Sequence, residues 1–421
     1  MIFKPLSEVA KIDISGVNKK IDDGEKLVKL CNFTDVYYSW AVTNTNVASF
    51  MTASANDNEI ERFKLKKGYV VITKDSETRD DIGIPCLIAD NLENTILGYH
   101  CALIIPDENQ LYGPYLNAYL NSKMARTYFS NQASGSGQRY TLTIGGIGNL
   151  KVPVIEMSKQ IKIGDLFSKI DKKIENNKIL ISELQSIAMT LYDYWFLQFE
   201  FPNEEGKPYK SSGGKMVYNK ELKREIPEGW KVENIDKHFD LISGYPFSSD
   251  NYCDFSNNKL YTIKNVQDGY IVSNVDTYIK TIPNNMEDEC ILKPKDLIMS
   301  LTGNVARVGL VYEQNCLLNQ RVLKIKNKNS NYGYCYCLFR SNSIKTYLER
   351  MASGTSQKNL SPVEVGKTLF CVPSSIVMKK FSAKANLLID KIVRCYQENQ
   401  KLASLRDFLL PMLMNGQVNF K

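Results

Sequence analysis

Two short loops of nearly the same sequence carry side chains suited to specific polar contacts. Residues 133–138 read Ala-Ser-Gly-Ser-Gly-Gln and are followed by Arg139, and residues 352–357 read Ala-Ser-Gly-Thr-Ser-Gln and are followed by Lys358. Guanidinium, ammonium and amide groups bond to base edges, and hydroxyl groups also serve phosphates. Small neighbours let the backbone approach a phosphate closely. We interpret the loops as candidates for nucleic-acid contact; the alternative is that they only shape the junction with the segment that follows.

A second pair of polar segments follows two apolar runs. Residues 302–307 come after the run 296–300, and residues 74–79 come after the run 68–73. We expect these segments to read DNA bases. The alternative is that their polar side chains are exposed to solvent and have no function. The candidate DNA-contacting residues are therefore Lys74, Arg79, Ser134, Ser136, Gln138, Arg139, Thr302, Asn304, Arg307, Ser353, Thr355, Gln357 and Lys358.

Sequence patterns for catalysis, metal or cofactors are missing. The two histidines neighbour no nucleophile motif, and the ten cysteines include no Cys-x-x-Cys pair of the kind that zinc sites use. Residues 145–148 lack the spacing of a dinucleotide-binding loop, and residues 303–309 lack the Gly-Lys-Ser/Thr ending of a phosphate loop. We expect no catalytic residue, no metal and no cofactor. The alternation of Cys335 and Cys337 predicts a strand with both thiols on one face.

The repeated loop is part of a larger internal repeat. Val-Pro follows each copy, at 152–153 and 372–373, and Ile-Asp-Lys follows again at 170–172 and 389–391. All matches lie 219 or 220 positions apart in a chain of 421 residues. The pattern predicts two unequal copies of one unit and a target with two unequal halves. An old duplication that left only structural symmetry is the alternative.

Each copy leads into a long heptad pattern, which is typical of a helix that packs on another long helix. The first helix, residues 161–197, would be roughly 55 Å long. Its seam positions are Ile163, Ile170, Asn177, Leu184 and Leu191, and Phe167, Ile174, Ile181, Ala188 and Trp195. Those of residues 379–413 are Phe381, Leu388, Cys395, Leu402 and Leu409, and Ala385, Ile392, Asn399, Arg406 and Leu413. Asn177 and Asn399 would fix the register if they meet; a loosely packed edge is the alternative.

The remaining segments predict strands, one helix and a linker. Residues 68–73 and 102–105 are apolar and β-branched, which favours strands, and residues 111–129 favour a helix. Residues 130–148 predict a loop or a loosely paired strand. Residues 201–228 have the turn-rich composition of a flexible linker.

Composition sets the broad class. A chain of 421 residues is too long to fold around a single hydrophobic core, so two or three domains are expected. The formal charge of +7 and a pI near 8.7 suit a polyanionic partner. No apolar run has the length of a membrane span, and the N-terminus is no signal peptide, so we expect a cytoplasmic protein without membrane contact.

These elements predict an α+β fold: two similar mixed α/β globular domains joined by two long antiparallel helices. The helices would form a coiled-coil spacer with pseudo-two-fold symmetry. Such a spacer exceeds one turn of duplex DNA, about 34–36 Å, so each domain could contact its own half of an asymmetric site.

The whole chain strongly resembles the specificity (S) subunits of type I restriction–modification systems. The resemblance rests on the paired loops, the Val-Pro pairs, the aromatic segment from Tyr194 to Pro202 and the sequence Ile-Pro-Glu-Gly-Trp at 226–230. The first half departs from the pattern because no Pro-x-Gly-Trp opening precedes it. The resemblance implies two target recognition domains that each read part of an interrupted DNA site. It also implies that the helices bind two methyltransferase (M) subunits, that restriction (R) subunits join this core, and that this chain is not an enzyme.

The expected domains are target recognition domain 1 at 1–157, a spacer helix at 158–200, the linker at 201–228, target recognition domain 2 at 229–375 and a second spacer helix at 376–421. The C-terminal end of the first spacer helix is apolar on almost every side. This predicts that it is buried either by the domains of this chain or in an interface with an M subunit. The predicted interface residues are Leu180, Ile187, Tyr192, Trp195, Phe196 and Phe199. The competing hypotheses are a stand-alone DNA-binding scaffold that dimerises through its helices, and an enzyme with an unrecognised site in the linker.

Overall fold

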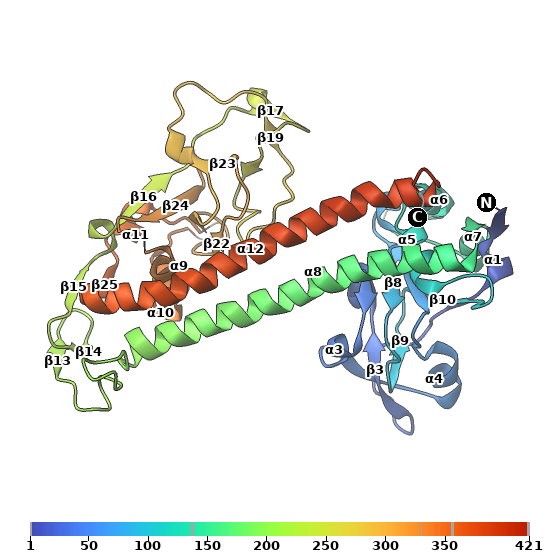
Figure 1. Cartoon of the computed structure of the whole chain (residues 1–421), viewed down its shortest axis with the longest axis horizontal. Helices are drawn as coiled ribbons and strands as arrows, with labels where there is room; N and C mark the ends of the chain where they lie inside the picture. The colour runs from blue at the N-terminus through green and yellow to red at the C-terminus, as the bar shows by residue number, and fades with distance from the viewer. Residues whose placement is uncertain (1, 136–138, 330, 355–357, 419–421) are drawn as a thin grey trace. The chain divides into compact units, whose positions relative to one another are not determined.

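The computed structural model describes residues 2–135, 139–329, 331–354 and 358–418 (Figure 1). The chain divides into two compact units: unit 1 is Met1–Glu175 with Lys401–Lys421, and unit 2 is Asn176–Gln400. Both units mix helices and strands, and both contain part of two long helices, α8 (Met157–Tyr192) and α12 (Ser375–Met414). The predicted fold class is confirmed in these elements.

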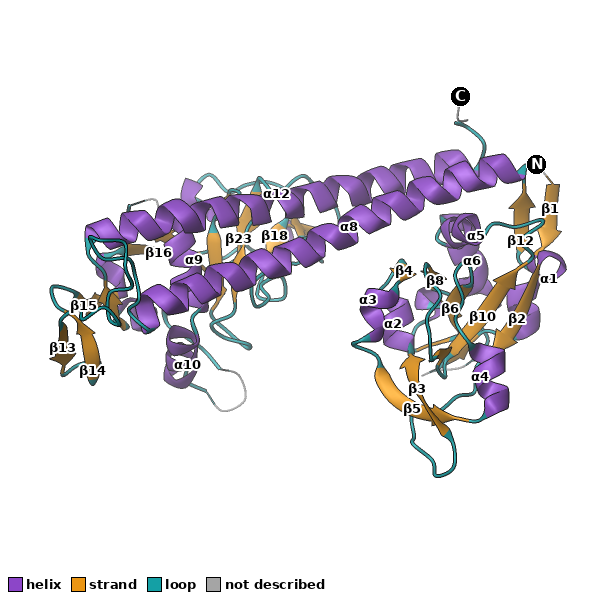
Figure 2. Ribbon diagram, turned by 60° about the horizontal axis from the view of Figure 1, so that its bottom comes forward, coloured by secondary structure: helices purple, strands orange, loops and turns teal. Residues whose placement is uncertain are grey.

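Unit 1 is built on a five-stranded sheet in the order β2-β10-β6-β8-β4. Its bounds are β2 (Ala10–Ile14), β10 (Cys101–Pro106), β6 (Val70–Thr73), β8 (Pro85–Ile88) and β4 (Ala41–Val42). The two runs predicted as strands became β6 and β10, and they pair antiparallel at the centre (Figure 2). All four residues of β6 are buried, which explains why the run is continuously apolar rather than alternating.

Smaller sheets flank this core. One has the order β5-β3-β9, and β1 pairs antiparallel with β12. Their bounds are β5 (Met51–Ala55), β3 (Lys26–Cys31), β9 (Thr95–Leu97), β1 (Ile2–Pro5) and β12 (Lys151–Val154). The remaining short helices are α1 (Leu6–Val9), α2 (Phe33–Tyr37), α3 (Asn44–Val47), α4 (Asp57–Phe63), α7 (Ile144–Gly148) and η1 (Arg79–Asp81). Within the segment predicted as loop, residues 130–148, the chain thus forms α7 as well as a short strand described below.

The single helix predicted at 111–129 is two helices, α5 (Gly113–Leu120) and α6 (Lys123–Gln132). The prediction missed the cap between them. The Ser122 hydroxyl accepts a hydrogen bond from the backbone N–H of Ala125 at 3.4 Å, which begins a new helix. Apolar spacing alone does not reveal such a break.

Unit 2 repeats the topology of unit 1. Its main sheet has the order β16-β24-β21-β22, which matches β2-β10-β6-β8, and β15 pairs with β25 as β1 pairs with β12. In a third match, β18 pairs parallel with β23 as β3 does with β9. The bounds are β16 (Phe239–Ser243), β24 (Val322–Asn327), β21 (Leu297–Ser300), β22 (Val308–Leu310), β15 (Lys231–Asn234), β25 (Leu369–Val372), β18 (Leu260–Tyr261), β23 (Cys316–Leu318), β20 (Ile291–Leu292), β17 (Tyr252–Cys253) and β19 (Tyr278–Ile279). The predicted similarity of the two globular parts is confirmed.

In unit 2, two adjacent helices and a short third helix follow the main sheet, as α5, α6 and α7 do in unit 1. They are α9 (Tyr332–Arg340), α10 (Asn342–Met351) and α11 (Pro362–Gly366), with the 3-10 turns η3 (Ile235–Lys237), η4 (Ser249–Asn251) and η5 (Asp288–Cys290). Cys335 and Cys337 lie in α9, so the predicted strand is wrong. Residues 333–339 are all buried, and a segment covered on every side carries no periodic pattern from which a strand and a helix can be told apart.

The segment predicted as a flexible linker is folded. It contains a hairpin of β13 (Met216–Asn219) and β14 (Arg224–Pro227). The ring of Phe201 stacks between Tyr209 and Trp230, with ring centroids 4.6 and 4.9 Å away. Polar turn residues dominate the composition of this segment, which is why the sequence predicted a flexible linker. The three aromatic residues that form its small core are widely spaced in the sequence and give no local pattern.

The two long helices pair antiparallel within unit 2. The rings of Trp195 and Phe381 lie 5.6 Å apart, and Asn177 Nδ2 donates to Asn399 Oδ1 at 2.9 Å, so positions rise along α8 as they fall along α12. The predicted meeting of the two asparagines is confirmed. Helix α8 ends in a π-helical turn at Asp193–Leu197.

Within unit 1, the beginning of α8 and the end of α12 share one apolar core. The indole of Trp40 joins them, because its ring lies 6.2 Å from that of Phe167 and 5.0 Å from the Arg406 guanidinium. The predicted seam positions are all buried or half-buried.

Candidate nucleic-acid interface

In unit 1, the two predicted polar segments lie side by side. Strand β7 (Asp75–Ser76) pairs antiparallel with β11 (Tyr140–Thr141). The backbone N–H of Leu142 donates to the Lys74 carbonyl at 2.9 Å, and that of Ser134 donates to the Thr141 carbonyl at 3.0 Å. We call residues 74–79 with 133–142 loop pair 1. The sequence predicted both segments but not their contact, which joins residues more than 60 positions apart.

Unit 2 repeats this arrangement. Thr302 and Ser353 each form a β-bridge with Asn359. The N–H of Leu360 donates to the Leu301 carbonyl at 2.8 Å, and that of Ser353 donates to the Asn359 carbonyl at 2.9 Å. We call residues 301–307 with 352–360 loop pair 2. The two loop pairs therefore share one backbone hydrogen-bond pattern.

A third strand end joins each loop pair. The N–H of Lys74 donates to the His100 carbonyl at 2.8 Å, and the N–H of Leu301 donates to the Arg321 carbonyl at 3.0 Å. These bonds place His100 and Arg321 at equivalent positions. Neither side chain is among the predicted site residues. The signal was present in the repeat, because residues 97–100 align there with residues 318–321.

Loop pair 1 is organised by the carboxylate of Asp75. Its Oδ2 lies 2.9 Å from Lys74 Nζ, 2.6 Å from His100 Nδ1 and 3.4 Å from Arg139 Nη2. Burial raises the pKa of Asp75, but hydrogen bonds from Thr141, His100 and Lys74 outweigh it and lower the pKa to about 2. Asp75 is therefore an anion that brings the nitrogen atoms of three side chains to one place.

Loop pair 2 has a different chemistry. The Thr302 hydroxyl is buried and has no hydrogen-bond partner among the described residues. Arg307 Nη1 donates to Gln267 Oε1 at 2.8 Å, so this guanidinium is held by a side chain of its own unit. The loop turns tightly, with positive φ at Gly303 (72°) and Ala306 (59°), and this turn leaves Asn304 exposed.

The predicted contact residues fall into three groups. The exposed ones are Arg79, Ser134, Arg139, Asn304, Ser353 and Lys358. Lys74, Thr302 and Arg307 are half-buried, and Lys74 and Arg307 are bonded within the unit as described. Ser136, Gln138, Thr355 and Gln357 lie outside the described residues. Each loop pair thus presents at least one exposed cationic side chain beside exposed hydroxyl groups.

Comparison with known proteins identifies the relatives of this fold. No protein-family model matches the chain. Along 84% of its length it is 22% identical to the type I restriction enzyme HindI specificity subunit of Haemophilus influenzae, covering 87% of that protein. It is 26% identical, again over 84% of its length, to the MjaIX specificity subunit of Methanocaldococcus jannaschii, covering 78% of that protein. The chain is thus similar along most of its length to type I restriction enzyme specificity subunits.

A solved structure supports the same fold. The S subunit of a type I restriction–modification system from M. genitalium superposes with a TM-score of 0.59 at 15% identity, covering 98% of this chain and 95% of that one. The resemblance to specificity subunits noted in the sequence is confirmed. Among the described residues, no helix has both the length and the apolar character needed to cross a bilayer, and no group of three or more metal-ligating side chains is found.

The predicted partner-interface residues, by analogy with specificity subunits, lie at the end of α8. Tyr192, Trp195, Phe196 and Phe199 are buried in unit 2, with 3–5% of each residue exposed. The Phe196 ring lies 4.8 Å from Phe381 and 5.1 Å from Tyr334, so the chain itself covers this end of the helix. Of the two remaining residues, Leu180 is half-buried and Ile187 is 53% exposed. The predicted surface is thus reduced to these two positions.

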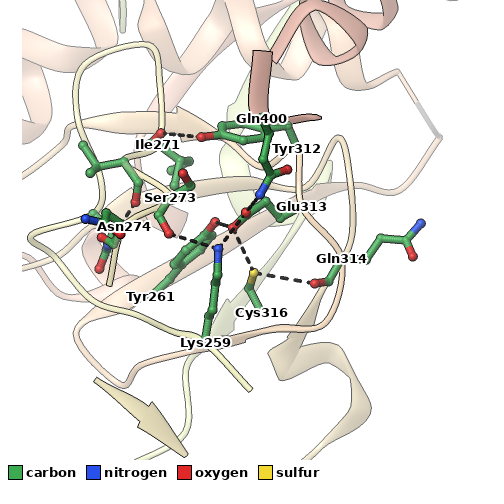
Figure 3. A network of polar contacts seen from close by, with 12 residues as sticks. Lys259, Tyr261, Ile271, Ser273, Asn274, Tyr312, Glu313, Gln314, Cys316 and Gln400 are labelled. Atoms are coloured by element: carbon green, nitrogen blue, oxygen red, sulfur yellow. Dashed lines mark hydrogen bonds and ion pairs between the residues drawn. The ribbon is translucent and has the colours of Figure 1, made fainter. Parts of the chain in front are cut away.

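A buried polar network fixes α12 to unit 2 (Figure 3). Glu313, in the turn between β22 and β23, is 7% exposed. Its carboxylate accepts hydrogen bonds from Tyr261 and from Gln400 of α12, and it lies 2.8 Å from Lys259 Nζ. Gln397, one turn earlier in α12, donates to the Tyr312 carbonyl at 2.9 Å. Burial raises the pKa of Tyr261, and nearby Cys316 and Glu313 raise it further, so this phenol stays protonated and donates.

Proposed function

We propose that the chain is the DNA sequence-recognition subunit of a type I restriction–modification complex. Residues 1–157 and 229–375 act as target recognition domains, and each reads one half of an asymmetric, bipartite site in double-stranded DNA. The observation that carries the proposal is the matched pair of loops. The two loop pairs share their backbone hydrogen bonds and lie at equivalent places in two similar folds. Their different side chains suit them to different base sequences.

The long helices, with the expected spacer bounds 158–200 and 376–421 and the linker 201–228, set the gap between the half-sites. They also dock two methyltransferase subunits, and restriction subunits join through that core. Exposed Ile187 is the best candidate contact at the end of α8, because burial of a large apolar side chain favours association. The chain is itself non-catalytic and acts in the cytoplasm.

Methylome sequencing of cells with and without the gene tests the recognition. We expect methylated adenines within an asymmetric interrupted sequence, and we expect that methylation to disappear when the gene is deleted. A palindromic motif, or methylation that persists without the gene, would contradict the proposal. Purification adds a second test: co-elution with two methyltransferase copies is expected, whereas a dimer of this chain alone favours the scaffold alternative.

The role of the helices has its own experiment. Inserting one whole heptad into each helix keeps the seam in register and lengthens the helix pair by about 10 Å. We expect an interrupted site with a longer gap and unchanged half-sites. An unchanged gap would show that the helices do not measure the distance between half-sites.

A further inference from the structure

A buried carboxylate lies beneath Arg139, one of the exposed cations of loop pair 1. The side chain of Asp75 is 8% exposed, that of Lys74 14%, that of His100 30% and that of Arg139 56%. The four side chains thus form a gradient from the interior to the surface. Only the outermost group, the Arg139 guanidinium, has most of its surface available to a ligand.

The hydrogen bonds fix the order of these groups. His100 Nδ1 lies 2.6 Å from Asp75 Oδ2, so this nitrogen carries a proton and donates it. Arg139 Nη2 lies 2.6 Å from the same Nδ1, but a nitrogen that donates cannot also accept. We therefore assign the guanidinium hydrogen bond to Asp75 Oδ2, at 3.4 Å, and the guanidinium lies against the imidazole without a hydrogen bond to it.

The backbone of His100 supports a dedicated arrangement. Its φ is 71°, in the left-handed region that favours glycine. The bond to Asp75 holds the imidazole in place despite this strain.

Loop pair 2 lacks this device. The equivalent positions, matched by the backbone hydrogen bonds, carry Leu301 for Lys74, Thr302 for Asp75 and Arg321 for His100. Thr302 has no negative charge with which to orient a cation, and Arg321 is exposed. The carboxylate is therefore a property of one unit rather than of the shared scaffold.

We propose that Asp75 is the positioning residue of the first half-site. It holds Arg139 and His100 in fixed directions so that they read base edges, and it does not touch DNA itself. Arg139 is suited to a guanine edge, because a fixed guanidinium can bond to O6 and N7 together. This inference rests on the proposed function of the chain in DNA recognition.

The experiment uses the substitution Asp75→Asn in the full chain, purified with its methyltransferase partner and offered a randomised double-stranded DNA library. Asn has nearly the same shape but cannot form the ion pairs. We expect discrimination at one or more base pairs of one half-site to fall about tenfold, in line with one lost bidentate contact. Affinity for unrelated DNA should hold or rise, because a negative charge near the phosphates has been removed.

The matched control is Glu77→Gln. Glu77 is exposed two residues away, so this change removes the same charge from the same loop and leaves the Asp75 bonds in place. The Glu77→Gln protein should recognise both half-sites as the unchanged protein does. The second half-site serves as a folding control inside the Asp75→Asn protein.

The possible failures are distinguishable. If the unchanged protein selects a bipartite motif and Asp75→Asn selects the same motif with equal discrimination, the positioning role is wrong and the proposed function stands. If the unchanged protein selects no bipartite motif, the proposed function itself fails. Loss of both half-sites together, or lower affinity for all DNA, would show a structural role for Asp75 and overturn the inference.

Discussion

The two loop pairs share one backbone hydrogen-bond pattern but hold their cationic side chains in different ways. In loop pair 1 a buried anion gathers Lys74, His100 and Arg139, whereas in loop pair 2 Thr302 is neutral and Arg307 is held by the amide of Gln267. The shared hydrogen bonds come from strand ends of equal topology. The difference teaches that the scaffold fixes where contacts are made, while a few loop residues decide which contacts they are.

The largest expected effect tests whether the two units are independent. Phe196→Ala removes a ring that is 5% exposed and packs on Phe381 and Tyr334 in unit 2. We expect the unfolding free energy of unit 2 to fall by about 3–5 kcal/mol, because a cavity is left. Hydrogen exchange resolved by peptide should show faster exchange in unit 2 and little change in the sheet of unit 1.

Phe408→Ala is the control, since Phe408 is 63% exposed on α12. It should change stability by no more than about 0.5 kcal/mol. Equal acceleration of exchange in both units by Phe196→Ala would mean that they unfold as one, and the two loop pairs could not then be compared separately.

The next effect is a pH dependence confined to loop pair 1. The pKa of Asp75 is lowered from 3.8 to about 2, so its contribution to stability is complete above about pH 4 and is lost as the pH falls towards 2. A shift of this size corresponds to about 2.5 kcal/mol. Urea unfolding of the unchanged protein and of Asp75→Asn should therefore differ by about that much near neutrality and converge near pH 2.

A control must show that the convergence of the two unfolding free energies near pH 2 is specific to the Asp75 carboxylate. The same measurement with Thr302→Val in loop pair 2 should give a difference that does not depend on pH between 2 and 4, because no titrating group is removed. A constant difference for Asp75→Asn would mean that the ion pairs around Asp75 do not contribute to stability.

The sequence predicted the frame of the molecule better than the contacts of its site. The heptad seams follow from apolar periodicity, which burial of one helix face imposes directly, and the strands at 68–73 and 102–105 follow from short runs of apolar, β-branched residues. The same reasoning failed for Cys335 and Cys337, which lie in a helix buried on all sides, and it missed the stacking of Phe201 on Trp230. Periodicity needs one exposed face, and pairing between distant residues leaves no local pattern.

The site shows the same limit. Both kinds of polar loop were found from composition, but their mutual pairing was not, and neither was the role of Asp75. A carboxylate in a polar loop predicts exposure, and only the convergence of three separate segments on it makes it a buried anion. His100 was aligned with Arg321 in the repeat, yet a lone histidine gave no reason to place it beside Arg139.

A smaller effect is expected for loop pair 2. Arg307→Ala removes the guanidinium that Gln267 orients. Discrimination at one half-site should fall by about 2 kcal/mol while the other half-site is read as before. Selection from a randomised DNA library measures both halves in one experiment. Equal weakening at every base pair would instead make Arg307 a phosphate contact, and loop pair 2 would then differ from loop pair 1 in kind rather than in sequence preference.

The smallest effect concerns how unit 2 holds its helix. Both units bond a tyrosine hydroxyl to an aspartate of a long helix, Tyr112 to Asp165 and Tyr332 to Asp390, each at 2.9 Å. Unit 2 adds the Glu313 network to α12. Glu313→Gln keeps the shape and an acceptor oxygen but loses the ion pair with Lys259. We expect the unfolding free energy of unit 2 to fall by about 1 kcal/mol.

The location of the change matters more than its size. Hydrogen exchange should accelerate in residues 259–261 and 397–400, and loop pair 2 should keep its protection. Asp276→Asn is the control, because its pair with Lys264 is more than 75% exposed on both sides and should contribute only a few tenths of a kcal/mol. If Glu313→Gln instead loosens loop pair 2, the attachment of the helix and the reading loops are coupled. The two units would then differ in how they hold their loops as well as in the side chains those loops carry.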